Sequence, residues 1–303
     1  IKIGPKAISS GNGYSMALKQ DGTVVAWGDN SLGQTDVPVG LNNVIAISSR
    51  WNHNLALKND GTVVSWGWNG YGQTNVPVGL SNVVSVASGG LHSLALKQDG
   101  TVVAWGDNNA GQLNIPMGLN NVASIAVGAD HNLALKKDGT VVAWGLNGSG
   151  QTNVPVGLSN VVQVAAGGYF SLALKADGTI VAWGDNNAGQ LNIPQGLNNI
   201  SVIAGGWGNV LALKKDGTVV AWGDNRQGQT NIPSGLSNVS AISPGAEYHC
   251  LALKQDGTIV TWGNNLAGQN NVPESIYTSD LPLGSNLIYN GDFELGNVGF
   301  ISQ

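Results

Sequence analysis

The sequence predicts an all-β protein, a seven-bladed β-propeller with four short antiparallel strands per blade and about 39 residues per repeat. A Trp-Gly pair recurs seven times, at a spacing of 39 residues five times and then 40. Each unit also places Asp-Gly between two apolar runs, which indicates a hairpin. Glycine, at 45 of 303 residues, is about twice as frequent as usual and separates short elements. The paired tryptophans are Trp27, Trp66, Trp105, Trp144, Trp183, Trp222 and Trp262.

The third unit illustrates the four strands expected in each blade. A β-branched run at Asn82–Ser88 is followed by apolar runs at 93–97 and 101–106, and the Asp-Gly between them fits the two positive-φ positions of a type I′ turn. A fourth strand is expected at 111–116, where the proline is compatible only with an edge strand. The apolar runs do not alternate with polar residues, which favours strands covered on both faces.

Seven units of this kind predict a closed ring rather than an open array. The glycine content and the lack of a helical period exclude a helical solenoid. An open β-solenoid is the remaining alternative, but it would need atypical end repeats. We interpret the repeated tryptophans as wedges that each blade packs against its neighbour.

Composition excludes several classes of function. The net charge of −5 and the pI near 5.2 argue against a nucleic-acid partner, which requires clustered Lys and Arg. No apolar run is long enough to insert into a membrane. The single cysteine, Cys250, stands where other repeats have serine and is expected to be a small buried residue. The opening IKIG, with neither an initiator Met nor a signal peptide, indicates a processed or excerpted piece.

Strand direction assigns the connections to two ends of the blades. The loop after the first strand and the loop after Trp-Gly lie at one end, which we call face X. The Asp-Gly turn and the Gly-Leu-x-Asn turn lie at the other, face Y. Face Y barely changes between repeats, whereas face X varies and holds every aromatic residue of 1–273 outside the Trp-Gly pairs. Aromatic clusters are typical of binding surfaces. The predicted binding residues are Tyr14, Arg50, Trp51, Trp68, Tyr71, Asp130, Tyr169, Phe170, Trp207, Arg226, Glu247 and Tyr248.

An alternative is that some of these aromatic side chains point inward and fill the mouth of the channel. It applies most to Tyr14 and Phe170, which share one repeat position with the four histidines. We interpret those histidines, at 53, 92, 131 and 249, as structural residues that bond a neighbouring backbone. No metal site, cofactor or catalytic residue is predicted: known motifs are missing, and Asp130 and Glu247 have no obvious partner.

A family resemblance follows from the pattern G-G-x-H-S-x-A-L-K … D-G-x-V-x-x-W-G-x-N-x-x-G-Q over residues 1–273. It resembles the repeat of the regulator-of-chromosome-condensation superfamily, whose members form seven-bladed propellers. The short unit is most similar to the propeller-type β-lactamase inhibitor proteins of bacteria. The nucleotide-exchange members have longer units and an inserted wedge, neither of which occurs here, so exchange activity is not expected.

The repeat stops after Pro273. Residues 274–285 are expected to form a linker. Residues 286–303 are expected to be a truncated start of a β-sandwich module or a disordered tail, because Asn286–Phe300 resembles the first strand of jelly-roll carbohydrate-binding modules of secreted bacterial proteins.

We therefore expect a non-catalytic binding module of an extracellular bacterial protein, secreted or at the cell surface, acting through face X. The expected partner is a protein, with a glycan next. The alternatives are an inhibitor of class A β-lactamases, which the resemblance implies, and a carbohydrate-binding propeller lectin.

Overall fold

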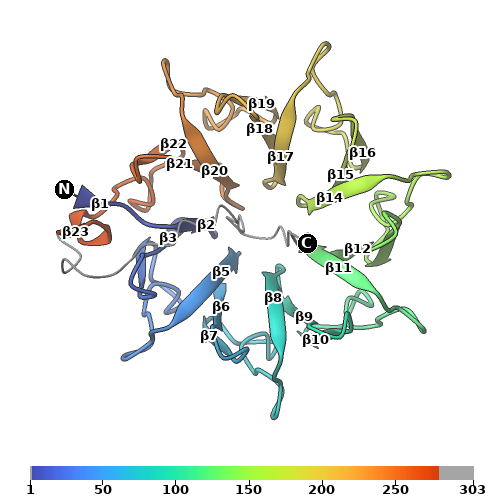
Figure 1. Cartoon of the computed structure of the whole chain (residues 1–303), viewed down its shortest axis with the longest axis horizontal. Coiled ribbons are helices and arrows are strands. Elements are labelled where there is room, and N and C mark those ends of the chain that lie inside the picture. Colours follow the sequence, from blue (N-terminus) through green and yellow to red (C-terminus); the bar gives the residue numbers. More distant parts are fainter. Residues whose placement is uncertain (1, 280–303) are drawn as a thin grey trace.

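The computed structural model describes residues 2–279, and its strands form seven sheets arranged around a central axis (Figure 1). In each sheet three consecutive strands pair antiparallel in chain order. The first strand of each blade points toward the centre of the ring (Figure 1). The blades are β2–β4 (Ala7–Ser10, Tyr14–Leu18, Val24–Gly28), β5–β7 (Val44–Arg50, His53–Lys58, Val63–Gly67), β8–β10 (Val83–Ser88, His92–Lys97, Val102–Gly106), β11–β13 (Val122–Val127, His131–Lys136, Val141–Gly145), β14–β16 (Val161–Ala166, Phe170–Lys175, Ile180–Gly184), β17–β19 (Ile200–Gly205, Asn209–Lys214, Val219–Gly223) and β20–β22 (Val239–Pro244, His249–Lys254, Ile259–Gly263).

The prediction of four strands per blade is wrong, because the segment expected to be the fourth strand forms turns. In the third blade the side chain of Asn108 replaces a strand partner. Its Oδ1 accepts a hydrogen bond from the backbone N–H of Leu113 at 2.8 Å, and its Nδ2 donates to Asn114 Oδ1 at 3.1 Å. Local side-chain bonds of this kind compete with strand pairing. The other blades repeat this arrangement from the equivalent asparagines at 30, 69, 147, 186, 225 and 265.

The Asp-Gly turns form as predicted, but not as type I′ turns. In the first blade Gly22 has φ +80° and Asp21 does not have a positive φ. Gly22 N–H donates to Lys19 C=O at 3.1 Å, and Lys19 N–H donates to Thr23 C=O at 2.8 Å. This is a three-residue hairpin loop with glycine at its left-handed position. The Asp21 carboxylate then accepts a bond from Thr23 N–H at 2.9 Å.

The repeated tryptophans are buried between neighbouring blades, which confirms their predicted role as wedges. Trp144 of the fourth blade packs against Leu94 and Leu96 of the third. Its indole N–H donates to Gln112 C=O of that blade at 3.0 Å. All seven tryptophans make this bond, at 2.9–3.2 Å. The core is therefore a ring of equivalent interfaces, each burying one large aromatic side chain.

The ring closes between the seventh and first blades with the same contacts. Trp27 N–H donates to Gln269 C=O at 2.9 Å, and Ser10 Oγ donates to Ser243 C=O at 2.9 Å. A further two-stranded sheet joins β1 (Lys2–Ile3) to β23 (Thr278–Ser279).

The first residues of the predicted linker pack against the seventh blade. Residues Glu274–Ile276 form a 3₁₀ helix, and Ile276 is fully buried beside Leu253. The propeller therefore extends to residue 279. The rest of that linker and the predicted module at 286–303 lie outside the described residues. No helix of the described part is long and apolar enough to cross a membrane.

Candidate binding surface

The two ends of the blades are arranged as the sequence predicts. On face X the second loop of the first blade joins its first loop, because Asp29 N–H donates to Gly13 C=O at 2.8 Å. On face Y the Gly-Leu-x-Asn turn joins the Asp-Gly turn, because Val44 N–H donates to Gly22 C=O at 3.0 Å. Each face is thus a continuous set of loops held by backbone bonds.

Two predicted binding residues, Tyr14 and Phe170, are fully buried, so their assignment to the surface is wrong. Each side chain fills the position that histidine occupies in four other blades. The Tyr14 hydroxyl donates to Asn54 Oδ1 of the next blade at 2.7 Å, and burial raises its pKa. These residues hold blades together.

The four histidines have the same structural role. Their Nε2 atoms lie 2.8–3.1 Å from a serine hydroxyl or an asparagine oxygen of the next blade. Backbone groups also interact with the rings of His53, His131 and His249. Burial lowers the pKa of His53 and His131 to about 3 and that of His92 and His249 to about 4. They are therefore neutral at physiological pH. Within residues 2–279 no group of three potential ligands is placed to hold a metal ion.

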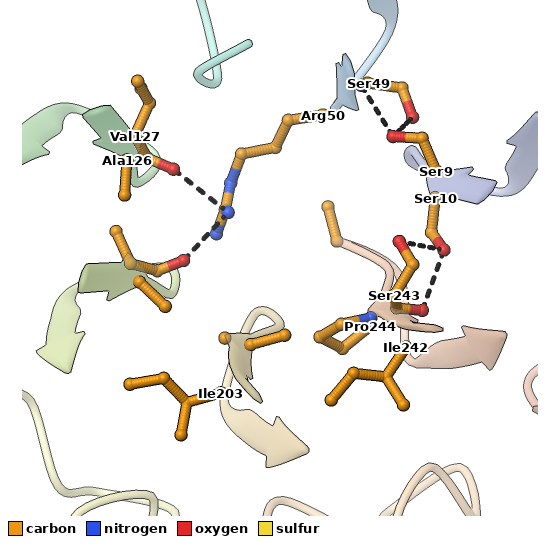
Figure 2. A pocket seen from close by; sticks show the side chains of 15 residues that line it. Ser9, Ser10, Ser49, Arg50, Ala126, Val127, Ile203, Ile242, Ser243 and Pro244 are labelled. Atoms are coloured by element: carbon orange, nitrogen blue, oxygen red, sulfur yellow. Dashed lines mark hydrogen bonds between the residues drawn. The ribbon is translucent and has the colours of Figure 1, made fainter. Parts of the chain in front are cut away.

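Arg50 is also buried, in contrast to the prediction that it lies on face X. Figure 2 shows its side chain crossing the channel from β5 toward β11 and β14. Its guanidinium donates to the carbonyls of Val127 at 3.3 Å, Ala166 at 3.2 Å and Gly206 at 3.5 Å. Burial lowers its pKa to about 10, against the attraction of Asp130. Arg50 thus fills the channel, leaving a cavity of about 50 Å³ beside it.

Three predicted aromatic residues from separate blades meet on face X. The ring centroids of Trp51 and Trp207 lie 5.9 Å apart, and Tyr169 stands edge-on to Trp207 at 5.3 Å. All three are partly exposed. Trp51 C=O accepts a bond from Asn12 N–H at 2.8 Å, and Trp207 C=O accepts one from Gly168 N–H at 3.1 Å. Neighbouring blades therefore fix the backbone of both tryptophans. We call Trp51, Tyr169 and Trp207 the aromatic cluster.

Trp68 and Tyr71 form a separate pair in the second loop of the second blade. Their ring centroids lie 5.6 Å apart in an edge-to-face arrangement, and Tyr71 is exposed. The aromatic side chains on the described part of face X therefore form one cluster and one separate pair rather than a continuous ring.

A cleft of about 460 Å³ opens between the fifth and sixth blades, beside the aromatic cluster. Tyr169 and Trp207 line one part of it, and Asp224 and Arg226 line another. Arg226 Nη2 lies 2.6 Å from Asp224 Oδ2, and its guanidinium carbon lies 5.5 Å from the centre of the Tyr248 ring. Predicted site residues from three blades thus converge here.

The acidic residues Asp130 and Glu247 each lie near a second carboxylate. Burial raises the pKa of Asp130, and Asp107 raises it further, while Arg50 opposes them. Burial and then Asp29 raise the pKa of Glu247. The two pairs therefore make this part of face X locally acidic.

Asp185 and Asp224 also line the cleft, although they are not among the predicted binding residues. One signal could have identified Asp224: only the sixth repeat places an arginine two residues after this aspartate. Nothing in the sequence indicates that Trp51 and Trp207, which are 156 positions apart, contact each other.

Three solved structures illustrate the similarity of this fold to known proteins. Prp20p from Saccharomyces cerevisiae is 22% identical, with a TM-score of 0.67 over 78% of this chain and 80% of that chain. The CRINKLY WD40 ectodomain of the Arabidopsis thaliana receptor kinase ACR4 is 20% identical, with a TM-score of 0.69 over 87% and 98%. The ectodomain of the Physcomitrella patens receptor kinase CR4 is 22% identical, with a TM-score of 0.72 over 87% and 73%.

At these identities the solved structures establish the fold alone. Among curated proteins no sequence relative of the chain is found. The family model described as the regulator of chromosome condensation (RCC1) repeat matches seven times, at residues 6–34, 44–73, 83–112, 122–151, 161–190, 200–229 and 239–269. These matches include every blade and most of the chain. The chain therefore belongs to the family of regulator of chromosome condensation (RCC1) repeat proteins.

Proposed function

We propose that this propeller is a non-catalytic module that binds a protein partner through face X. The aromatic cluster is the observation that carries the proposal. Three large side chains from the second, fifth and sixth blades meet at one point, although the blades fold equally well with glycine or alanine at the equivalent positions. Rigid aromatic side chains provide much of the binding energy at protein interfaces.

The surroundings of the cluster favour a protein over a small ligand. Cluster, cleft and acidic residues are spread over several blades, and an interface of standard size needs about 800 Å² on each partner. Two structures of one yeast relative support the choice of partner class: the Prp20p structure is described with its binding to Gsp1p and histones, and yeast RCC1 (Prp20) was solved bound to Kap60.

Inhibition of a class A β-lactamase is a narrower form of this proposal, and glycan binding is a second candidate function. Inhibition of a class A β-lactamase is favoured by the short repeat unit, which resembles that of bacterial inhibitor propellers. Glycan binding is favoured by the cleft, where Tyr169 and Trp207 stand beside Asp185 and Asn187. We also propose that the module acts outside a bacterial cell, secreted or at its surface, on the resemblance of Asn286–Phe300 to carbohydrate-binding modules.

The test compares the two faces directly. A photo-crosslinking amino acid is placed on face X at Trp68 or on face Y at Asp99, and both variants are exposed to the proteins of a bacterial culture medium. The proposal requires one partner that crosslinks from face X, is not captured from face Y, and is lost when Trp207 is replaced by alanine. Crosslinking from face Y, or retention of the partner by the Trp207→Ala variant, would contradict it.

Two further arms separate the narrower functions. Hydrolysis of a chromogenic cephalosporin by a class A β-lactamase, titrated with the propeller, tests inhibition. Binding to immobilised glycans, with and without Trp207→Ala, tests sugar recognition. A loss of β-lactamase activity that Trp207→Ala relieves would select the inhibitor, and glycan binding that the same variant abolishes would select the lectin.

A further inference from the structure

The second loops of the first, third and fifth blades share a hydrogen bond that the sixth blade lacks. In those three blades the Nε2 of the glutamine that recurs in every repeat donates to Oδ2 of an aspartate five residues earlier, at 2.8, 3.0 and 2.7 Å. The sixth blade has the same two residue types, Asp224 and Gln229, but Gln229 Nε2 has no partner although the side chain is completely buried. Leaving a buried amide unpaired is unfavourable.

Arg226 is the reason for this difference. Its Nε lies 3.0 Å from both carboxylate oxygens of Asp224, and its Nη2 lies 2.6 Å from Oδ2. Asp224 thus bonds Arg226 instead of Gln229. In the second, fourth and seventh blades the Nε2 of the glutamine also has no partner, but there the position of the aspartate is occupied by Trp68, Leu146 or Asn264. Only the sixth blade has an aspartate at this position and still leaves the amide Nε2 without a partner.

The arginine itself is available to a partner. Its side chain is 72% exposed, and it is the only exposed Arg or Lys on the described part of face X. Tyr248 holds the guanidinium in place, with its ring 5.5 Å away and its hydroxyl 3.3 Å from Nη2. A planar guanidinium that is already oriented is suited to two-point binding of a carboxylate.

We propose that Arg226 binds the side-chain carboxylate of a glutamate presented by the protein partner, and that Asp224 then moves to Gln229. The methylene groups of that glutamate would lie against Trp207 and Tyr169 in the cleft. The contact that Asp224 loses with Arg226 is replaced by a hydrogen bond from Gln229, like the one that Gln190 donates to Asp185 in the fifth blade. The acidic residues elsewhere on face X would repel a carboxylate, which restricts it to this one place.

This inference deepens the proposed function and depends on it for the identity of the partner, but its test does not require the partner. The probes are N-acetylglutamate amide and N-acetylglutamine amide, which differ only in the side-chain carboxylate. Their binding to the isotope-labelled propeller is followed through the indole N–H signal of Trp207 and the side-chain amide signals of the glutamines. Gln190 serves as the reference for a glutamine whose Nε2 bonds an aspartate, and Gln73 as the reference for one whose Nε2 has no partner.

We expect the carboxylate probe to bind about tenfold more tightly than its amide, and to move the Gln229 signal toward that of Gln190. Arg226→Gln should abolish the difference between the probes. Asp224→Asn removes the internal competitor and should tighten binding of the carboxylate probe, whereas Asp107→Asn, in the third blade, should leave it unchanged. A crystal structure of Arg226→Gln should show Asp224 bonded to Gln229.

Three results would overturn the inference: equal binding of the two probes, carboxylate binding that survives Arg226→Gln, or weaker binding in Asp224→Asn. If any of these occurs while Trp207→Ala still disrupts the partner complex, the role of Arg226 is wrong and the proposed function stands. If Trp207→Ala leaves the partner bound, the proposed function fails, whatever the probes show.

Discussion

Face X and face Y are built from the same seven repeats but follow opposite rules. On face Y every Asp-Gly turn repeats one set of contacts: Asp99 accepts from Thr101 N–H and Oγ1, and its equivalents lie 3.2–3.8 Å from a lysine. On face X no two of the seven first loops have the same sequence except for their shared glycines. The difference teaches that the contacts between blades specify the fold, which leaves the residues of one face free to specify a partner.

The largest effect should be the pH dependence of the free energy of unfolding that the four buried histidines cause. They belong to the framework, by which we mean the buried residues that hold neighbouring blades together. Because folding lowers their pKa from about 6.5 to about 3 or 4, the unfolded chain binds more protons below pH 6.5, and the free energy of unfolding falls as the pH falls through that window. We expect a loss on the order of 5 kcal/mol between pH 6.5 and 5, measured by urea unfolding.

Asp130 and Glu247 on face X should change the free energy of unfolding in the opposite direction, raising it as the pH falls, because their pKa values are raised in the folded protein. The repulsion and desolvation of these carboxylates are relieved as they take up protons.

A variant of one histidine tests the larger effect. His131→Asn, which imitates Asn209 in the sixth blade, should reduce by about a quarter the slope of the free energy of unfolding against pH between pH 5 and 6.5. An unchanged slope in this variant would show that the histidines do not carry the effect.

The next largest effect separates a framework tryptophan from a tryptophan of face X. Trp105→Ala should lower the free energy of unfolding by about 3–5 kcal/mol, because it leaves a cavity between two blades and removes one of the two side-chain hydrogen bonds to the carbonyl of Gln73. Trp68→Ala should cost less than about 1 kcal/mol, because that side chain is partly exposed. Denaturant unfolding of both variants makes the comparison, and similar losses would remove the distinction between framework and face.

A smaller effect should appear in binding alone. Trp207→Ala should weaken the partner complex by about 2 kcal/mol, or roughly thirtyfold, with little change in unfolding. Leu266→Ala is the control, since this 91% exposed side chain lies on face X in the seventh blade and outside the aromatic cluster. Titration calorimetry with the crosslinked partner measures both. Equal losses would mean that the cluster has no special role.

The smallest effect belongs to face Y. Lys97→Ala breaks an ion pair of 3.4 Å with Asp99, whose side chain is about half exposed. Exposed pairs of this kind contribute little to stability, so neither the free energy of unfolding nor partner binding should change measurably. A clear loss of partner binding in this variant would shift the proposed surface away from face X.

The repeat made most of the fold predictable. The spacing of Trp-Gly and the position of Asp-Gly were sufficient for seven blades, the wedge tryptophans and the two faces. The absence of a fourth strand was not predictable from strand propensity, because it results from hydrogen bonds of the Asn108 side chain to the backbone at Leu113. The recurrence of that asparagine in every repeat was the available signal, and its role is structural rather than in binding.

The candidate site was less predictable, because a sequence does not show where long side chains point. Arg50 and Trp51 are adjacent and both depart from the repeat, yet one fills the channel and the other joins the surface cluster. Tyr14 and Phe170 depart from it as well, but they replace a buried histidine. Departure from a repeat therefore identifies positions under a separate constraint, while the structure decides whether that constraint is packing or recognition.

The short pairing of β1 with β23 determines how the propeller responds to tension along the chain. Lys2 pairs with Ser279 at one end of this antiparallel ladder, and Ile3 pairs with Thr278 at the other. A force that pulls Lys2 and Ser279 apart would therefore open the pair one rung at a time, rather than shearing both rungs together. The next attachment is the buried side chain of Ile276, and behind it the seventh blade still packs on the first. The β1–β23 pair would therefore separate before the contacts between the seventh and first blades are broken.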